Sequence, residues 1–125
     1  MKKILFVEDD SSLYKMYSTE LELRGYQVVW ESNGANAFSK AQAEYPDLIL
    51  LDLMLPKLNG FELLRELQED DTSDIPIVII TGRNTNPSTR GMMKREPNVK
   101  GFMEKPVKQH VLAALMYTLL KTQKQ

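Results

Sequence analysis

The chain contains no cysteine and only one histidine. The lack of cysteine excludes disulfide bonds, thiol catalysis and cysteine-ligated metal, and it is typical of a reducing compartment. No apolar run approaches the roughly 18 residues that a membrane-spanning helix needs. The N-terminal lysines are followed by only four apolar residues before Glu8, too few for a secretory signal. We therefore expect a soluble, cytoplasmic protein.

Charge of one sign is also not in excess. The formal net charge is −1, so the overall charge does not favour nucleic acid or a membrane surface as a direct partner. The length of 125 residues suits one domain, and a hydrophobic content of 42% is enough for a packed core. We expect residues 1–125 to form one domain that ends in a polar tail from about residue 121.

Short apolar segments recur along the chain and predict five strands. Uninterrupted apolar runs without polar alternation are typical of strands buried on both faces of a parallel sheet. The expected strands lie at residues 4–7, 27–31, 48–52, 75–80 and 99–103.

The segments between these strands, and the segment after the last one, predict helices. Leu13, Met16, Tyr17, Leu21 and Leu23 recur at mostly three- and four-residue steps, which indicates one apolar helix face that ends before a glycine. Similar spacing occurs in three later segments, and residues 84–98 allow a short fourth helix. Five alternating strands and helices predict an α/β fold, a doubly wound parallel sheet with five helices on its two faces.

Polar side chains stand where four of the strands end. Glu8 and Asp9 follow the first strand, Asp52 ends the third, Thr81 ends the fourth, and Lys105 follows the fifth. In open α/β sheets, ligands bind beyond the carboxyl ends of the strands. Any one of these residues alone is more often a cap, a turn hydroxyl or a surface charge, so the interpretation depends on the joint arrangement.

The residue types favour phosphoryl chemistry. Crowded carboxylates repel one another, so they take up protons or bind a cation. Oxygen ligands without histidine or cysteine select Mg²⁺, or Mn²⁺. Lys105 can hold a phosphate oxygen and Thr81 can donate a hydroxyl, which makes Asp52 a candidate nucleophile that forms an acyl phosphate.

With these motifs the sequence resembles the receiver domain of a two-component response regulator. The resemblance extends from Lys3 to about Lys121. The motifs are ILFVEDD at residues 4–10, DLILLDLMLP at residues 47–56, Gly60, Thr81-Gly82 and Lys105-Pro106. The resemblance implies a flavodoxin-like, five-stranded parallel sheet with strand order 2-1-3-4-5.

The resemblance also implies a metal site and a phosphoacceptor. Asp52 would accept phosphate from a sensor histidine kinase or a phosphotransfer protein. Asp9, Asp52 and the backbone carbonyl of Met54 would ligate Mg²⁺, and Glu8 would contribute through a water molecule. The domain would be a signalling switch that catalyses only its own phosphorylation and dephosphorylation.

A conformational switch is implied in the same way. Lys105 would form an ion pair with the phosphoryl group, and Thr81 would donate a hydrogen bond to it. The peptide bond between Lys105 and Pro106 would be cis. Phe102 stands three residues before the lysine, at the position of the aromatic residue that moves inward in the family. The conformational change would be recognised by a downstream protein or a fused effector domain. Whether phosphorylation also causes dimerisation is not decided by the sequence.

Two other functions fit parts of this pattern less well. A metal-dependent phosphatase of the haloacid dehalogenase type needs a second aspartate two residues after the nucleophile, and Met54 stands there instead. A flavin-binding module of the flavodoxin type needs a phosphate-binding loop after the first strand. The acidic residues 8–10 would repel phosphate unless a metal intervened.

Overall fold

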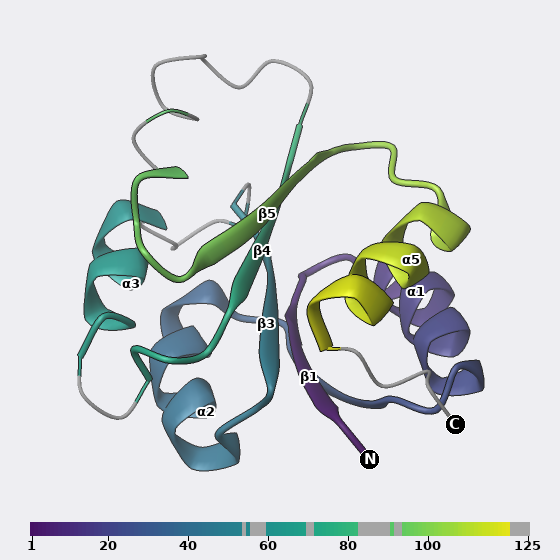
Figure 1. The fold of residues 1–125 in the computed structure, drawn as a ribbon, viewed down its shortest axis with the longest axis horizontal. Coiled ribbons are helices and arrows are strands. Elements are labelled where there is room, and N and C mark those ends of the chain that lie inside the picture. The colour runs from purple at the N-terminus through teal and green to yellow at the C-terminus, as the bar shows by residue number, and fades with distance from the viewer. Residues whose placement is uncertain (54, 56–59, 70–71, 83–90, 92–93, 121–125) are drawn as a thin grey trace.

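The computed structural model describes residues 1–53, 55, 60–69, 72–82, 91 and 94–120. Strands and helices alternate along the chain (Figure 1). The elements are β1 (Lys3–Val7), α1 (Ser11–Leu23), β2 (Gln27–Glu31), the 3₁₀ helix η1 (Gly34–Asn36), α2 (Ala37–Glu44), β3 (Leu48–Asp52), α3 (Gly60–Glu66), β4 (Ile77–Thr81), β5 (Val99–Glu104) and α5 (Gln109–Leu120).

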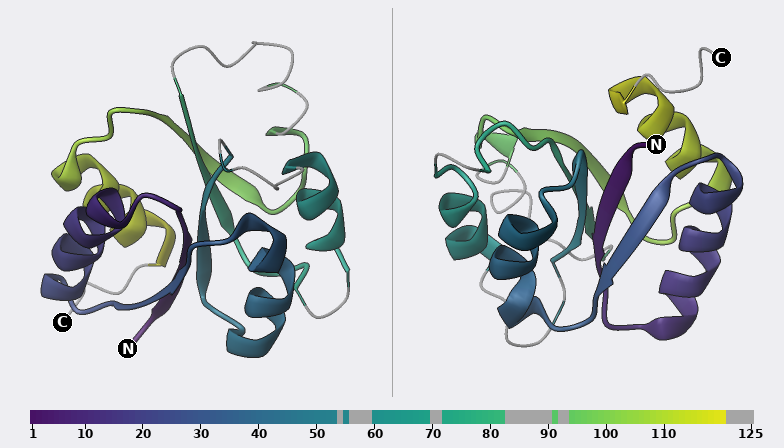
Figure 2. Two further views of the ribbon diagram at one scale, coloured as in Figure 1. Left: turned by 180° about the vertical axis from the view of Figure 1, so that it is seen from behind. Right: turned by 90° about the horizontal axis from the view of Figure 1, so that it is seen from below.

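The five strands form one sheet in the order β2-β1-β3-β4-β5, and every neighbouring pair is parallel. Helices α1 and α5 cover one face of the sheet, while α2 and α3 cover the other (Figures 1 and 2). This arrangement confirms the predicted fold class and strand order.

The core consists of two clusters, one on each face of the sheet. Alternate side chains of β3 point to opposite faces, so Leu50 packs on the α1 and α5 side and Leu51 on the α2 and α3 side. All residues of β3 and β4 are buried. The uninterrupted apolar runs therefore mark strands covered on both faces, as predicted.

Helix α1 ends before Gly25, as predicted, but its apolar face was only partly predicted. The Asp10 carboxylate caps the helix by accepting the amides of Ser12 and Leu13, at 2.9 and 3.1 Å. The exposed fractions of Met16 and Leu23 are 41% and 80%, so placing them on the buried face was wrong. Leu23 follows the buried Leu21 by two residues, and side chains two apart on a helix do not share a face.

The Lys105–Pro106 peptide bond is cis, as predicted. Among the helices that the structure describes, none has the length and apolar character needed to cross a lipid bilayer. The fourth helix expected in residues 84–98 lies largely outside the described residues, as does the tail from residue 121.

A buried asparagine joins three elements at the other end of the sheet from the predicted site. Asn98 is 4% exposed, and its amide donates to the carbonyl of Ile75 at 3.0 Å. Its side-chain oxygen accepts a hydrogen bond from Gln68, beyond the end of α3, and its backbone carbonyl accepts the amide of Ile77 at 2.7 Å. These bonds fix the starts of β4 and β5 relative to α3.

Candidate functional site

The predicted polar side chains come together at one edge of the sheet because the strands that carry them are parallel. Glu8 is the first residue after β1, Asp52 is the last of β3, and Thr81 is the last of β4. Lys105 follows β5, and its amide donates to the carbonyl of Thr81 at 2.8 Å. The fold therefore carries these groups to the carboxyl edge, where α/β sheets bind ligands.

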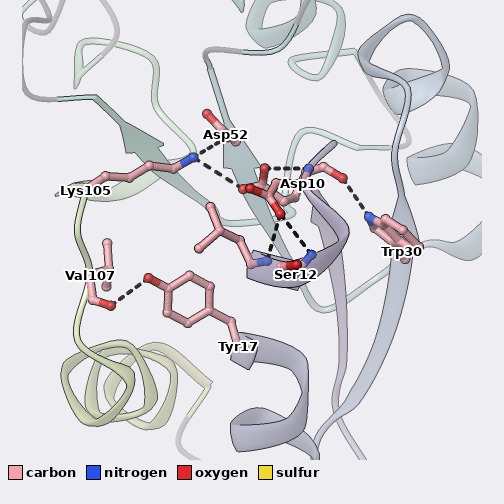
Figure 3. Close-up of polar contacts among 9 residues, drawn as sticks. Asp10, Ser12, Tyr17, Trp30, Asp52, Lys105 and Val107 are labelled. Carbon is pink, nitrogen blue, oxygen red and sulfur yellow. Dashed lines mark hydrogen bonds and ion pairs between the residues drawn. The ribbon is translucent and has the colours of Figure 1, made fainter. Parts of the chain in front are cut away.

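A lysine and two buried carboxylates form the centre of the site. The ammonium nitrogen of Lys105 lies 2.7 Å from Oδ2 of Asp52 and 3.5 Å from Oε1 of Glu8. Asp52 is 2% exposed and Glu8 is 1% exposed. Figure 3 shows the Lys105 side chain, which follows β5, extending toward Asp52 at the end of β3. The cation thus partly compensates charges that are costly to bury.

Glu8 is the least well compensated member of this group. Its Oε2 accepts the amide of Asp10 at 3.1 Å, whereas its Oε1 is buried without a hydrogen-bond partner among the described residues. Burial raises the pKa of the Glu8 carboxyl from 4.5 to about 7, and the charge of Asp52 acts in the same direction, while the Asp10 amide opposes it. Glu8 therefore retains its proton more readily than an ordinary glutamate.

The pKa of the Lys105 ammonium lies above its usual value. Burial by itself would lower the pKa of the ammonium, but the hydrogen bond and charge of Asp52, together with Glu8, outweigh that effect and raise the pKa. Lys105 is consequently a permanent cation at neutral pH.

We expect the stability of the metal-free protein to fall as the pH rises from about 4.5 to about 7, relative to a Glu8→Gln variant. Between these values the folded state keeps the Glu8 proton that the unfolded chain releases, so raising the pH favours unfolding. The full shift corresponds to about 3 kcal/mol. Urea unfolding of both proteins in chelating buffer at several pH values measures the difference. Parallel curves for the two proteins would contradict the assignment.

The acidic residues fit a hard divalent cation. Glu8, Asp9 and Asp52 each offer a carboxylate oxygen, and these oxygens lie within 4.8 Å of one another. Asp9 is exposed, whereas the other two are buried, so the cluster opens to solvent on one side. The donors are all oxygens, and Oε1 of Glu8 lacks a hydrogen-bond donor among the described residues, which suits Mg²⁺. Met54, whose carbonyl the resemblance adds, lies outside the described residues.

The two expected switch residues lie on neighbouring strands. Thr81 is fully buried at the end of β4. Phe102 is half-buried in β5 and packs against the core cluster on the α2 and α3 side of the sheet. The ammonium of Lys94 lies 5.3 Å from the centre of the Phe102 ring.

Two aromatic residues near the site were not foreseen. The hydroxyl of Tyr17 in α1 donates to the carbonyl of Val107 at 2.7 Å (Figure 3). This hydrogen bond joins the segment after Lys105 to α1. The indole nitrogen of Trp30 in β2 donates to the carbonyl of Glu8 at 2.6 Å. The sequence gives no signal for either bond, because each joins segments that only the fold brings together.

Comparison with known proteins shows the family. Residues 4–117 match the model of the response regulator receiver domain. The chain belongs to this family. Protein PilH of Pseudomonas aeruginosa is 35% identical to this receiver domain over 124 residues, which cover 98% of the chain and 94% of PilH. The family places the chain in two-component signalling, as a signalling domain and not a metabolic enzyme.

Longer regulators also resemble this receiver domain. The alkaline phosphatase synthesis transcriptional regulatory protein PhoP of Bacillus subtilis is 42% identical over 83 residues, which cover 66% of the chain and 34% of PhoP. The matched part spans about a third of the length of these transcriptional regulators.

Solved receiver structures superpose closely on this one. The signal receiver domain of a histidine kinase from Syntrophus aciditrophicus is 31% identical, with a TM-score of 0.83, covering 100% of this chain and 94% of that one. A receiver domain of a Pseudomonas aeruginosa sensor histidine kinase is 25% identical, with a TM-score of 0.82, covering 97% and 98%. The latter structure has a magnesium ion coordinated in its active-site cleft.

Proposed function

We propose that this receiver domain accepts a phosphoryl group on Asp52 in the presence of Mg²⁺, and that residues 1–125 act as one switch. The donor is a sensor histidine kinase or a phosphotransfer protein. The observation that carries the proposal is the buried Asp52 carboxylate, 2.7 Å from the Lys105 ammonium and within 4.8 Å of two further carboxylates. The family and the magnesium-bound relative support it.

The chemistry requires one displacement at phosphorus. A carboxylate oxygen of Asp52 attacks the phosphoryl group, the bond from phosphorus to the donor nitrogen breaks, and the bonding electrons leave with the imidazole. Lys105 is placed to pair with a phosphoryl oxygen as charge develops on it. Asp9, Asp52 and the Met54 carbonyl would hold Mg²⁺, and Glu8 would contribute through a water molecule. When bound, the ion neutralises negative charge on the phosphoryl oxygens.

The added charge then changes the site. An acyl phosphate brings nearly two negative charges to a site where Lys105 already pairs with Asp52 and Glu8. Lys105 and the Thr81 hydroxyl are drawn toward the new oxygens, and the backbone of β5 carries this change to Phe102. The phenylalanine ring has no hydroxyl to favour one rotamer, so we expect a softer switch than a tyrosine would give. A downstream protein or a fused effector domain reads the change.

Acetyl phosphate labelling tests the proposal. The protein is incubated with acetyl phosphate and Mg²⁺, and with acetyl phosphate and a chelator as the control. Intact mass spectrometry should show the gain of one phosphoryl group only with Mg²⁺, and borohydride trapping followed by peptide mapping should locate it at Asp52. Equal labelling in the chelator, or trapping at a different residue, would contradict the proposed site.

A further inference from the structure

We propose that Trp30 is a positioning residue for the metal site, because its indole N–H holds the peptide unit that joins Glu8 to Asp9. The inference rests on the proposed function and adds a residue to it. Trp30 lies on β2, the edge strand of the sheet, and carries no charge or ligand atom of its own. Its effect on the site must therefore pass through the backbone that it contacts.

The hydrogen bond from Trp30 restrains the start of the acidic segment, residues 8–10. Nε1 of Trp30 donates to the carbonyl of Glu8 at 2.6 Å, and the amide of Glu8 donates to the carbonyl of Glu31 at 3.0 Å. Both backbone polar groups of Glu8 are thus bonded to β2. The carbonyl of Glu8 and the amide of Asp9 belong to one planar peptide unit, so a bond that restrains the carbonyl also restrains the position of the Asp9 backbone.

The indole is itself held in place by an aromatic stack. The Trp30 ring lies parallel to the ring of Tyr14 in α1, with centroids 4.5 Å apart and planes at 10°. Tyr14 in turn contacts Phe6, with centroids 5.5 Å apart, and Phe6 is the register partner of Trp30 on β1. The donor N–H therefore projects from a ring with little freedom to move away from Glu8.

The site needs such a restraint because its carboxylates repel one another. The oxygens of Glu8, Asp9 and Asp52 lie within 4.8 Å, and Lys105 compensates only part of their charge. A loop free to move would carry Glu8 and Asp9 away from Asp52 before a cation arrives. A bond from β2 to the Glu8 carbonyl keeps the ligands together, which lowers the cost of binding the cation.

The proposal is tested with variants that change the N–H and the ring separately. Trp30→Phe keeps an aromatic ring and removes the donor. Replacement of Trp30, the only tryptophan of the chain, by benzothienylalanine keeps the ring shape and replaces N–H by sulfur. Tyr14→Phe is the matched control, since it removes a polar group from the same stack and leaves the indole donor intact. Calorimetric titration with magnesium chloride at constant ionic strength gives the affinity of each protein.

Both Trp30 variants should bind Mg²⁺ about fivefold more weakly than the wild type, the size expected for one lost hydrogen bond, and Tyr14→Phe should stay within about twofold. The fluorescence of Trp30 in the wild type should change along the same saturation curve as the calorimetric signal. Wild-type affinity in the benzothienylalanine protein, or an unchanged emission at saturating Mg²⁺, would overturn the role of Trp30 and leave the proposed function intact. A wild type that binds no Mg²⁺ would overturn the proposed function as well.

Discussion

An Asp52→Asn variant will take up no phosphoryl group from acetyl phosphate and Mg²⁺, whereas the wild type will be labelled. The amide is nearly the same size as the carboxylate but offers no anionic oxygen to attack phosphorus. The Lys105 ammonium, which lies 2.7 Å from Oδ2 of Asp52, would also lose the negative charge that it now compensates. Intact mass spectrometry on both proteins, after the same incubation, measures the loss.

The control for this experiment is Asp47→Asn. Asp47 precedes the same strand, is exposed, and accepts the Lys3 amide at 2.8 Å, a bond that an asparagine oxygen can retain. It should be labelled like the wild type. Circular dichroism should show that both variants are folded, because Asp52→Asn removes a buried charge next to Glu8 without leaving a cavity. Labelling of Asp52→Asn at the wild-type level would refute Asp52 as the acceptor.

A Lys105→Ala variant should still accept a phosphoryl group on Asp52, roughly 100-fold more slowly, but should not transmit the change to Phe102. The slower uptake follows from the loss of a positioned cation. The lost transmission follows because Lys105 is joined by the backbone of β5 to Phe102, and its amide is bonded to Thr81. Amide spectra of isotope-labelled protein, with and without acetyl phosphate and Mg²⁺, report both effects.

Lys100→Ala is the matched control for this second experiment. Lys100 lies on β5 and is exposed. The Lys100→Ala variant should therefore be labelled like the wild type, and phosphorylation should change the amide signals around Phe102 as it does in the wild type. Wild-type shifts around Phe102 in Lys105→Ala would contradict the coupling through the lysine. A wild type in which the Phe102 region does not respond to phosphorylation would exclude the switch itself.

The sequence was sufficient to predict the sheet because its signals are local. The apolar run ending at Asp52 and the run ending at Thr81 each form a strand that is buried throughout. Asp10 stands directly before the apolar-periodic segment and caps α1, a local signal of the same kind. Parallel pairing of these strands follows from the alternation with helices, and it accounts for the convergence of the polar side chains.

The remaining features depend on contacts between distant segments. The buried residues of α1 are Tyr17, Ser18 and Leu21, and the sheet and α5 do not cover Met16 or Leu23, so these two were placed wrongly. Asn98 is buried because Gln68 and Ile75 supply its hydrogen bonds, and polar side chains of this kind are read as surface residues from the sequence alone.

Within the site, the sequence predicted which groups meet but not how they pair. Two features result from side-chain packing at the strand ends: the direct bond between Lys105 and Asp52, and the Glu8 oxygen that has no hydrogen-bond partner in the described part of the chain. The indole bond of Trp30 to the backbone is likewise a product of the fold. These contacts determine the electrostatics of the site, so its residue types could be predicted while its charge balance could not.

The most direct measurement is a crystal structure of the protein grown with magnesium and beryllofluoride, which mimics a phosphoryl group. We expect a divalent ion coordinated by Asp9 and Asp52, a beryllofluoride group on a carboxylate oxygen of Asp52, and the Lys105 ammonium turned from that carboxylate to a fluorine atom. Clear density for the side chains with no ion between them, or acidic groups that point apart, would contradict it.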